Sequence, residues 1–309
     1  MRPTLSGRWA AAFLSLALGL LNTLALQGAP KTPYGEAGFP AWQAKRAKSI
    51  GGTNGWSSLA GLLWLHEGTN SLGGGITNEL KLPKDHSPEV VGNVIRTGYR
   101  ARFVAASPGV AKINGKPVVR AKLKSDENGA TPAVLQVDQL AITVIKRGER
   151  FGLRVRDPQA PTRLHFTGLD WFPYDPQWRL EGRLEKPATP RTLLIGDVTG
   201  VSANEKSPGT VIFTRKGQEY RLDALLDEDE HDLFVIFRDR TSGETTYGGG
   251  RFVHATVPDR QGRVIIDFNY AYNPPCAFTR YATCPIPPRQ NTLPIAVEAG
   301  EKKYRGGHE

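Results

Sequence analysis

The sequence has few cysteines and no second long apolar run. Its 309 residues contain two cysteines, Cys276 and Cys284. Two cysteines alone cannot complete a zinc site, and their spacing is not that of a C-x-x-C redox pair. After the N-terminal region, no apolar stretch reaches the ~20 residues that span a bilayer. We therefore expect no cysteine zinc site and no later membrane span.

Standard catalytic signatures are also absent. The chain contains no G-x-S-x-G, H-E-x-x-H, P-loop or G-x-G-x-x-G motif. The sequence therefore does not indicate a common serine hydrolase, a zincin or a nucleotide-binding enzyme. The catalytic residues, if any exist, and any cofactor stay unknown, as does the oligomeric state.

The positive charge is dispersed along the chain. The formal net charge is +10 at pH 7, yet no run of five lysines or arginines occurs. Such a balance favours anionic neighbours, for example acidic glycans or membrane surfaces. We expect a small polar or anionic ligand as a partner, and no nucleic acid.

The N-terminal region is typical of a secretory signal peptide. Arg2 and Arg8 precede an apolar run over residues 9–21, and the small residues Thr23 and Ala25 follow. This order predicts a signal peptide over residues 1–25, cleaved after Ala25, and export to the periplasm or the extracellular space. The alternative is a permanent N-terminal anchor. After cleavage no membrane span is expected.

The periodicity of the remaining chain is mainly that of β-strands. Residues 39–50 predict one short helix, with Pro40 in its first turn and Gly51-Gly52 after its end. Strands and turns follow at spacings near ten residues, without βαβ alternation. Predicted strands or hairpins cover residues 178–185, 211–225, 233–237, 251–257 and a strand from Val264.

This pattern predicts a mainly β fold. We expect two packed antiparallel β-sandwich or barrel-like halves, preceded by the helix. The first half, with the helix, would cover residues 38–157, and the second would cover residues 158–305. The boundary between them is predicted at the segment DPQAP, residues 157–161, which is too short for a flexible linker.

Five blocks of the sequence are distinctive: WSSLAGLLWLHEGTNSLGG at 56–74, FTGLDWFPYDPQW at 166–178, FRDRTSGETTYGGGRF at 237–252, DFNYAYNPPCAFTRYATCPIPPRQNTL at 267–293 and AGEKKY at 299–304. Together they resemble the bacterial and archaeal family called domain of unknown function 1684. The resemblance runs over nearly the whole chain after the signal peptide. It implies no particular activity.

The first half contains two further segments of interest, GTNSLGGGITNELKLP at 68–83 and KINGKPV at 112–118. These segments are similar to forkhead-associated domains, which are β-sandwiches that bind phosphothreonine. Gly74 stands where that family has an arginine, and Ser87 is followed three places later by Val90 instead of histidine. The resemblance therefore implies a fold without a phosphothreonine site.

The sequence gives little indication of a metal site. The segment DEDEHD, residues 227–232, is either a solvated acidic turn, which we favour, or a metal cluster. His66, His86, His165 and His254 are scattered and are expected to be structural or surface residues. No metal site is predicted.

The aromatic block at residues 169–178 allows two interpretations. Trp171, Tyr174 and Trp178, together with nearby aspartates, are residue types that stack on sugar faces and bind hydroxyls. Alternatively, these large side chains fill the junction between the two halves.

The segment at residues 267–288 holds five prolines and both cysteines. In an exported chain this segment predicts a local disulfide between Cys276 and Cys284. The alternative is a pair of buried free thiols.

A polar row is predicted in the same segment. If the strand from Val264 continues to Asn273, then Asp267, Asn269 and Asn273 share one face, with Phe268, Tyr270 and Tyr272 on the other. Arg251 would then bind Asp267 or an anionic ligand. With Asp239 these residues form a candidate polar site. The alternative is a structural clamp that satisfies backbone donors.

Two classes of function follow. The first is an exported envelope module with a binding or structural role. The second is an enzyme or small-ligand-binding protein with a polar pocket near Asp239, Arg251 and Asp267.

Overall fold

The computed structural model describes residues 35–227 and 232–306, and these residues belong to one compact unit. The predicted signal peptide and most of the acidic segment 227–232 lie outside the described residues. In the part of the chain that is described, no helix is long and apolar enough to cross a membrane.

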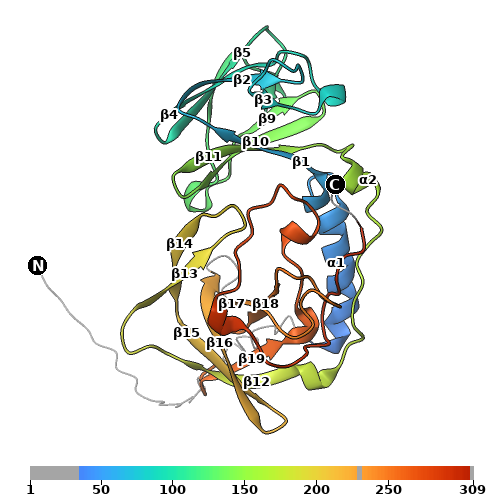
Figure 1. Cartoon of the computed structure of the whole chain (residues 1–309), viewed down its shortest axis with the longest axis vertical. Helices are drawn as coiled ribbons and strands as arrows, with labels where there is room; N and C mark the ends of the chain where they lie inside the picture. Colours follow the sequence, from blue (N-terminus) through green and yellow to red (C-terminus); the bar gives the residue numbers. More distant parts are fainter. Residues whose placement is uncertain (1–34, 228–231, 307–309) are drawn as a thin grey trace, which may run out of the picture. The chain divides into compact units, whose positions relative to one another are not determined.

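The predicted N-terminal helix is confirmed as α1, Phe39–Gly51. Pro40 occupies its first turn, where a missing N–H has no consequence, and alanines and lysines fill its interior. At its end Gly51 leaves room for the ring of Phe166, which would lie 2.5 Å from a Cβ at this position. Figure 1 shows α1 beside the C-terminal part of the chain.

Two sheets form a β-sandwich in the first half. One sheet has the strand order β1-β11-β10-β9-β6-β7 and the other the order β3-β2-β4-β5-β8. Their bounds are β1 Leu59–Leu65, β2 Gly68–Gly73, β3 Leu80–Lys81, β4 Gly92–Thr97, β5 Arg100–Ala105, β6 Lys112–Ile113, β7 Lys116–Pro117, β8 Arg120–Leu123, β9 Val134–Val137, β10 Leu140–Arg147 and β11 Arg150–Arg156.

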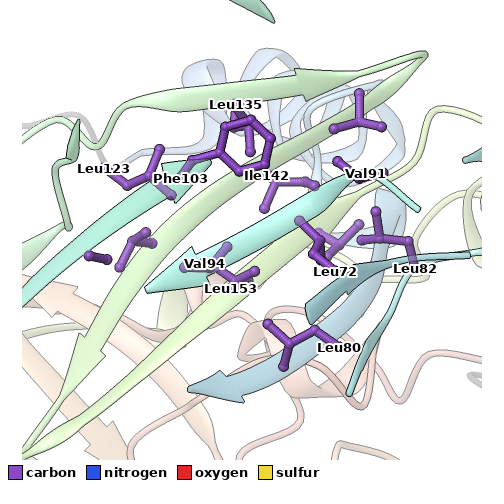
Figure 2. Packing of buried hydrophobic residues seen from close by; sticks show 14 of the residues in the cluster. Leu72, Leu80, Leu82, Val91, Val94, Phe103, Leu123, Leu135, Ile142 and Leu153 are labelled. Carbon is purple, nitrogen blue, oxygen red and sulfur yellow. The ribbon is translucent and has the colours of Figure 1, made fainter. Parts of the chain in front are cut away.

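The sandwich core is aliphatic and draws on both sheets. Leu72, Val94 and Phe103 come from one sheet, and Ile142 and Leu153 from the other (Figure 2). All five side chains are fully buried or nearly so. Burial of such faces supplies the main stabilisation of a two-sheet layer, at about 25 cal/mol per Å² of apolar surface.

A closed six-stranded barrel forms the second half. Its strand order is β12-β15-β16-β17-β18-β19, while β13 and β14 form a separate two-stranded sheet. The bounds are β12 Arg179–Glu185, β13 Arg191–Gly196, β14 Ser202–Ser207, β15 Gly209–Arg215, β16 Gln218–Asp227, β17 Asp232–Phe237, β18 Arg251–Ala255 and β19 Arg263–Asp267. Closure removes the exposed edges of the sheet. The mainly β prediction is therefore confirmed.

The predicted strands of the second half are found where the alternation placed them. In β12 the charged residues are exposed, and Leu180 and Leu184 pack against the barrel core. The predicted hairpin is β15 and β16, with Lys216 and Gly217 at φ 50° and 76°. Positive φ at both positions is the requirement of a type I′ turn, whose twist matches paired strands.

The strand predicted from Val264 is confirmed as β19, but it does not continue to Asn273, which the predicted polar row required. Strand β19 ends at Asp267, and a 3₁₀-helix, η6, covers Phe268–Tyr270. The side chain of Asp267 accepts a hydrogen bond from the backbone N–H of Asn269 and so caps this turn. Consequently Asp267, Asn269 and Asn273 do not form a row on one face of a strand.

Short helical turns continue through the linking and C-terminal segments. The α-helical turn α2, Pro161–Leu164, begins at the last residue of the segment DPQAP. The remaining 3₁₀-helices are η1 Glu36–Gly38, η2 Trp56–Ser58, η3 Lys84–His86, η4 Glu127–Gly129, η5 Pro176–Trp178, η7 Pro275–Ala277 and η8 Arg289–Asn291.

Candidate functional site

Arg251 and Asp239 form a fully buried ion pair. Arg251 Nη2 donates to Asp239 Oδ2 at 2.7 Å, and both side chains are 0% exposed. The guanidinium also donates to the carbonyl oxygens of Val297 and Ala299, at 2.8 and 2.5 Å. Burial lowers the pKa of Arg251, and the Asp239 carboxylate opposes that shift. The predicted partner, Asp267, is not the residue that binds Arg251.

Asp267 and Asn269 lie in a second buried cluster. Asn269 donates its backbone N–H and its Nδ2 to Asp267 Oδ1, at 3.0 and 2.8 Å. Asn269 also accepts from the backbone N–H of Asp175 at 2.9 Å, and so joins η6 to the segment before β12. Burial raises the pKa of Asp267 because the charged carboxylate loses its hydration.

Asn273 belongs to a third cluster, which holds α1. Its Nδ2 donates to Glu301 Oε1 at 2.9 Å, and its carbonyl accepts from Arg46 Nη2 at 2.6 Å. Arg46 Nε also binds Glu301 Oε2 at 3.1 Å. The five predicted polar residues are therefore all buried, but they are divided among three clusters that connect backbone segments.

The predicted aromatic contact residues are also separated. Trp178 is buried in the barrel, with its ring centroid 5.8 Å from that of Phe268. Trp171 and Tyr174 instead contact Phe39 of α1, at centroid distances of 5.9 and 5.5 Å. Burial beside Asp267 raises the pKa of Tyr174 to about 12. The three rings therefore do not form one sugar-binding surface.

The two cysteines are neighbours in the structure. Both are buried and are free thiols, and the backbone N–H of Cys276 donates to Cys284 Sγ at 3.1 Å. The predicted disulfide stays a prediction.

A different pair, His86 and Asp157, lies in a polar pocket. The cavity has a volume of about 460 Å³, within the range of small-molecule sites. His86 Nδ1 and Asp157 Oδ2 are 2.5 Å apart, and the His86 side chain is 32% exposed while that of Asp157 is 3% exposed. We call this cavity the His86 pocket.

Asp157 fixes the orientation of the His86 ring. The other Asp157 oxygen, Oδ1, accepts from Gln139 Nε2 at 3.0 Å and from the backbone N–H of Gln159 at 2.8 Å. A carboxylate only accepts hydrogen bonds, so Nδ1 of His86 carries the proton and Nε2 is the acceptor of the neutral ring. Among the described residues nothing hydrogen-bonds Nε2.

Cations surround this pair. Lys81, Lys84 and Arg280 line the pocket, together with Asp85. The pocket therefore combines exposed positive side chains with a ring that is held by a hydrogen bond. Such a set can bind a carboxylate or phosphate group, since hydrogen bonds between ionised partners are stronger than neutral ones. In the described part of the chain, no three His, Cys, Asp or Glu side chains are grouped as metal ligands.

The sequence contains no local signal for this pair. His86 and Asp157 are 71 residues apart, on η3 after strand β3 and directly after strand β11. Only the pairing of strands in the sandwich brings them together. His86 was one of four scattered histidines, and nothing near it in the chain distinguished it.

These features define a mainly β protein with a helix, a sandwich, a closed barrel and a polar pocket containing a histidine–aspartate pair. The chain belongs to the family described as protein of unknown function DUF1684, whose family model matches residues 164–302. No curated protein matches the chain.

Solved structures give further similarities. An uncharacterised protein of Haloarcula marismortui is 34% identical, with 47% of this chain and 81% of that chain covered and a TM-score of 0.39. A structure described in terms of phosphothreonine-dependent forkhead-associated domain interactions is 19% identical, covering 31% of this chain and 92% of that one, with a TM-score of 0.22. The forkhead-associated domain of FhaA, in a complex, is 18% identical over 31% of this chain and 97% of that chain, also with a TM-score of 0.22.

Proposed function

We propose that this chain is an exported module of the cell envelope that binds a small anionic ligand in the His86 pocket. The observation that carries the proposal is the buried Asp157 carboxylate that orients His86 inside a cavity of about 460 Å³. Export rests on the order of charged, apolar and small residues over residues 1–25.

The ligand class follows from the charges in the pocket. Arg280 and Lys84 are exposed at its rim, so each can turn toward a bound anion at little structural cost. His86 adds a fixed hydrogen-bonding atom, Nε2, which can accept a hydrogen bond from a hydroxyl group of the ligand, such as the O–H of a hydrogen phosphate. Two carboxylates, Asp85 and Asp157, oppose this preference, but the three cations Lys81, Lys84 and Arg280 outnumber them in the lining.

The alternative is a polar site around Asp239, Arg251 and Asp267. These side chains are buried and bonded to one another or to backbone groups, and none of them lines the His86 pocket. That arrangement favours a structural role for them. The His86 pocket is accordingly the better candidate for a ligand site.

Calorimetric titration with inorganic phosphate and with acetate tests the binding part of the proposal. We expect one or both anions to bind, and the double variant Lys84→Gln/Arg280→Gln to weaken binding at least tenfold. Arg289→Gln is the matched control because Arg289 is exposed in the same C-terminal segment but does not line the pocket. Absence of binding, or equal loss in the control, would contradict the proposal.

N-terminal sequencing of the protein from the envelope fraction tests export. We expect the mature chain to begin at Leu26, directly after Ala25. A chain that starts at Met1 in the cytoplasm would remove the basis for an envelope role, although the binding result would stand independently.

A further inference from the structure

A second cavity lies between α1 and the barrel. Its volume is about 240 Å³. One face of α1 supplies Trp42, Lys45, Arg46 and Ser49, which recur at helical spacing, and the opposite side is formed by His254, Tyr270 and Tyr272. We call it the α1 pocket. It shares no lining residue with the His86 pocket.

The aromatic walls of the α1 pocket are held in place. Tyr270 donates its hydroxyl to the carbonyl of Gly35 at 2.7 Å, and its ring centroid lies 4.9 Å from that of Trp42. The rings of Tyr272 and His254 are nearly parallel, at 8°, and His254 Nε2 lies 2.9 Å from the Tyr272 hydroxyl. Rigid walls lower the entropy lost when a ligand binds.

The two cations at the pocket differ in their roles. Arg46 lies 4.5 Å from the centre of the Tyr272 ring, and its guanidinium is bound by the buried Glu301 and by the carbonyl of Asn273. Its charge is therefore compensated within the fold. Lys45, one residue earlier, is exposed, and in the described residues it forms no ion pair. Its charge is available to a ligand.

These contacts define the chemistry of a ligand. Aromatic faces pack on the apolar C–H faces of a ring, while Ser49 and the ammonium of Lys45 offer hydrogen bonds at the rim. Pockets for drug-sized ligands begin at about 300 Å³, so a smaller cavity fits a single ring. We propose that the α1 pocket binds one sugar ring that carries a carboxylate, with the ring against Trp42 and the carboxylate on Lys45.

Titration with glucuronate, and separately with glucose, tests this proposal. The titrations are done at low ionic strength in the Lys84→Gln/Arg280→Gln background, which weakens anion binding in the His86 pocket. There we expect glucuronate to bind at least fivefold more tightly than glucose, and Lys45→Gln to abolish the difference. Lys48→Gln is the matched control, because Lys48 is exposed on the same helix but does not line the pocket. Saturation-transfer NMR should show the ring C–H protons of glucuronate in contact with the protein.

Three results would overturn the proposal. The first is equal binding of glucose and glucuronate, and the second is an unchanged glucuronate affinity in Lys45→Gln. The third is binding of benzoate without binding of glucuronate, since this would assign the pocket to a planar aromatic acid. The double variant Lys84→Gln/Arg280→Gln should retain glucuronate binding here, which separates this site from the His86 pocket.

Discussion

At the scale of residues, the chain buries an unusual number of charges in its C-terminal segment. Arg251, Asp239, Asp267 and Glu301 are all nearly inaccessible to solvent. Each is paired or hydrogen-bonded, because an isolated buried charge would be strongly unfavourable. Their bonds connect strands β18 and β19 with loops that contain many prolines. The buried polar residues therefore favour the structural clamp over the ligand site as the role of the predicted polar row.

Removing one partner of the buried pair should destabilise the protein strongly. We expect Arg251→Met to lower the free energy of unfolding by about 3–5 kcal/mol, since Asp239 would remain as a buried charge without its cation. Denaturation in urea measures the change. Arg263→Met is the control because its pair with Asp259 is largely exposed, and it should cost about 1 kcal/mol or less. A small effect at both positions would contradict the clamp interpretation.

Asp267 should make stability depend on pH. Burial raises the pKa of its carboxyl above the value of about 3.9 in an unfolded chain. Between these two values the folded protein binds a proton that the unfolded chain has lost. The stabilisation from this group is thus complete below the unfolded pKa and is lost as pH rises through the folded pKa.

The variant Asp267→Asn isolates this contribution. As pH rises from about 4, the free energy of unfolding of the wild-type protein should fall relative to that of the variant, which has no carboxyl to titrate. Urea denaturation at a series of pH values gives the comparison. A difference that is constant with pH, or that rises, would show that the pKa of Asp267 is not raised.

At the scale of elements, strands β12 and β15 of the barrel approach each other closely at Gly182. A Cβ at Gly182 of β12 would lie 2.2 Å from the carbonyl oxygen of Ile212 in β15. Only glycine permits this separation of the two strands. The approach is part of barrel closure, because β12 pairs with β15 on one side and with β19 on the other.

Gly182→Ala should therefore destabilise the barrel by about 1–3 kcal/mol through overpacking. Gly196→Ala, in β13, is the control, since the nearest atom to its Cβ would be 3.4 Å away. We expect the control to change stability by no more than about 0.5 kcal/mol. Thermal or urea unfolding measures the stability of both variants. Equal stability of the two would show that the close approach of β12 and β15 does not require glycine at position 182.

The elements themselves were predicted with uneven success, for a physical reason. Helix α1 and the β15–β16 hairpin were correct because proline, glycine and alternation act locally. The strand from Val264 was correct, but its continuation to Asn273 fails at Asp267, whose carboxylate caps the turn at Asn269. Alternating residues are compatible with a strand, but a side chain that bonds the backbone two residues later ends it.

At the scale of the whole molecule, the proposed export would determine the oxidation state of the cysteine pair. Cys276 and Cys284 are buried in contact, within a segment that also packs against Trp56 and Tyr247. We expect the protein isolated from the envelope to be oxidised at this pair, and the disulfide to contribute on the order of 2 kcal/mol.

Alkylation after unfolding without reductant, followed by intact mass measurement, tests this expectation. An oxidised protein takes up no alkylating agent, whereas a parallel sample treated with reductant takes up two equivalents. The variant Cys276→Ser/Cys284→Ser should then have the lower midpoint of thermal unfolding. Two alkylated thiols in the sample without reductant would exclude the bond.

The sequence by itself determined the local structure of this protein and its family. Alternation of apolar and polar residues predicts which face of a strand is buried, and proline or glycine predicts where a helix ends or the chain turns. The mainly β fold and α1 could therefore be predicted from the sequence. The candidate sites depended on contacts across the chain. His86 meets Asp157 from 71 residues away, and Arg46 meets Glu301 from 255 residues away. Local sequence patterns do not specify which buried faces pack against each other, because those contacts depend on the tertiary structure.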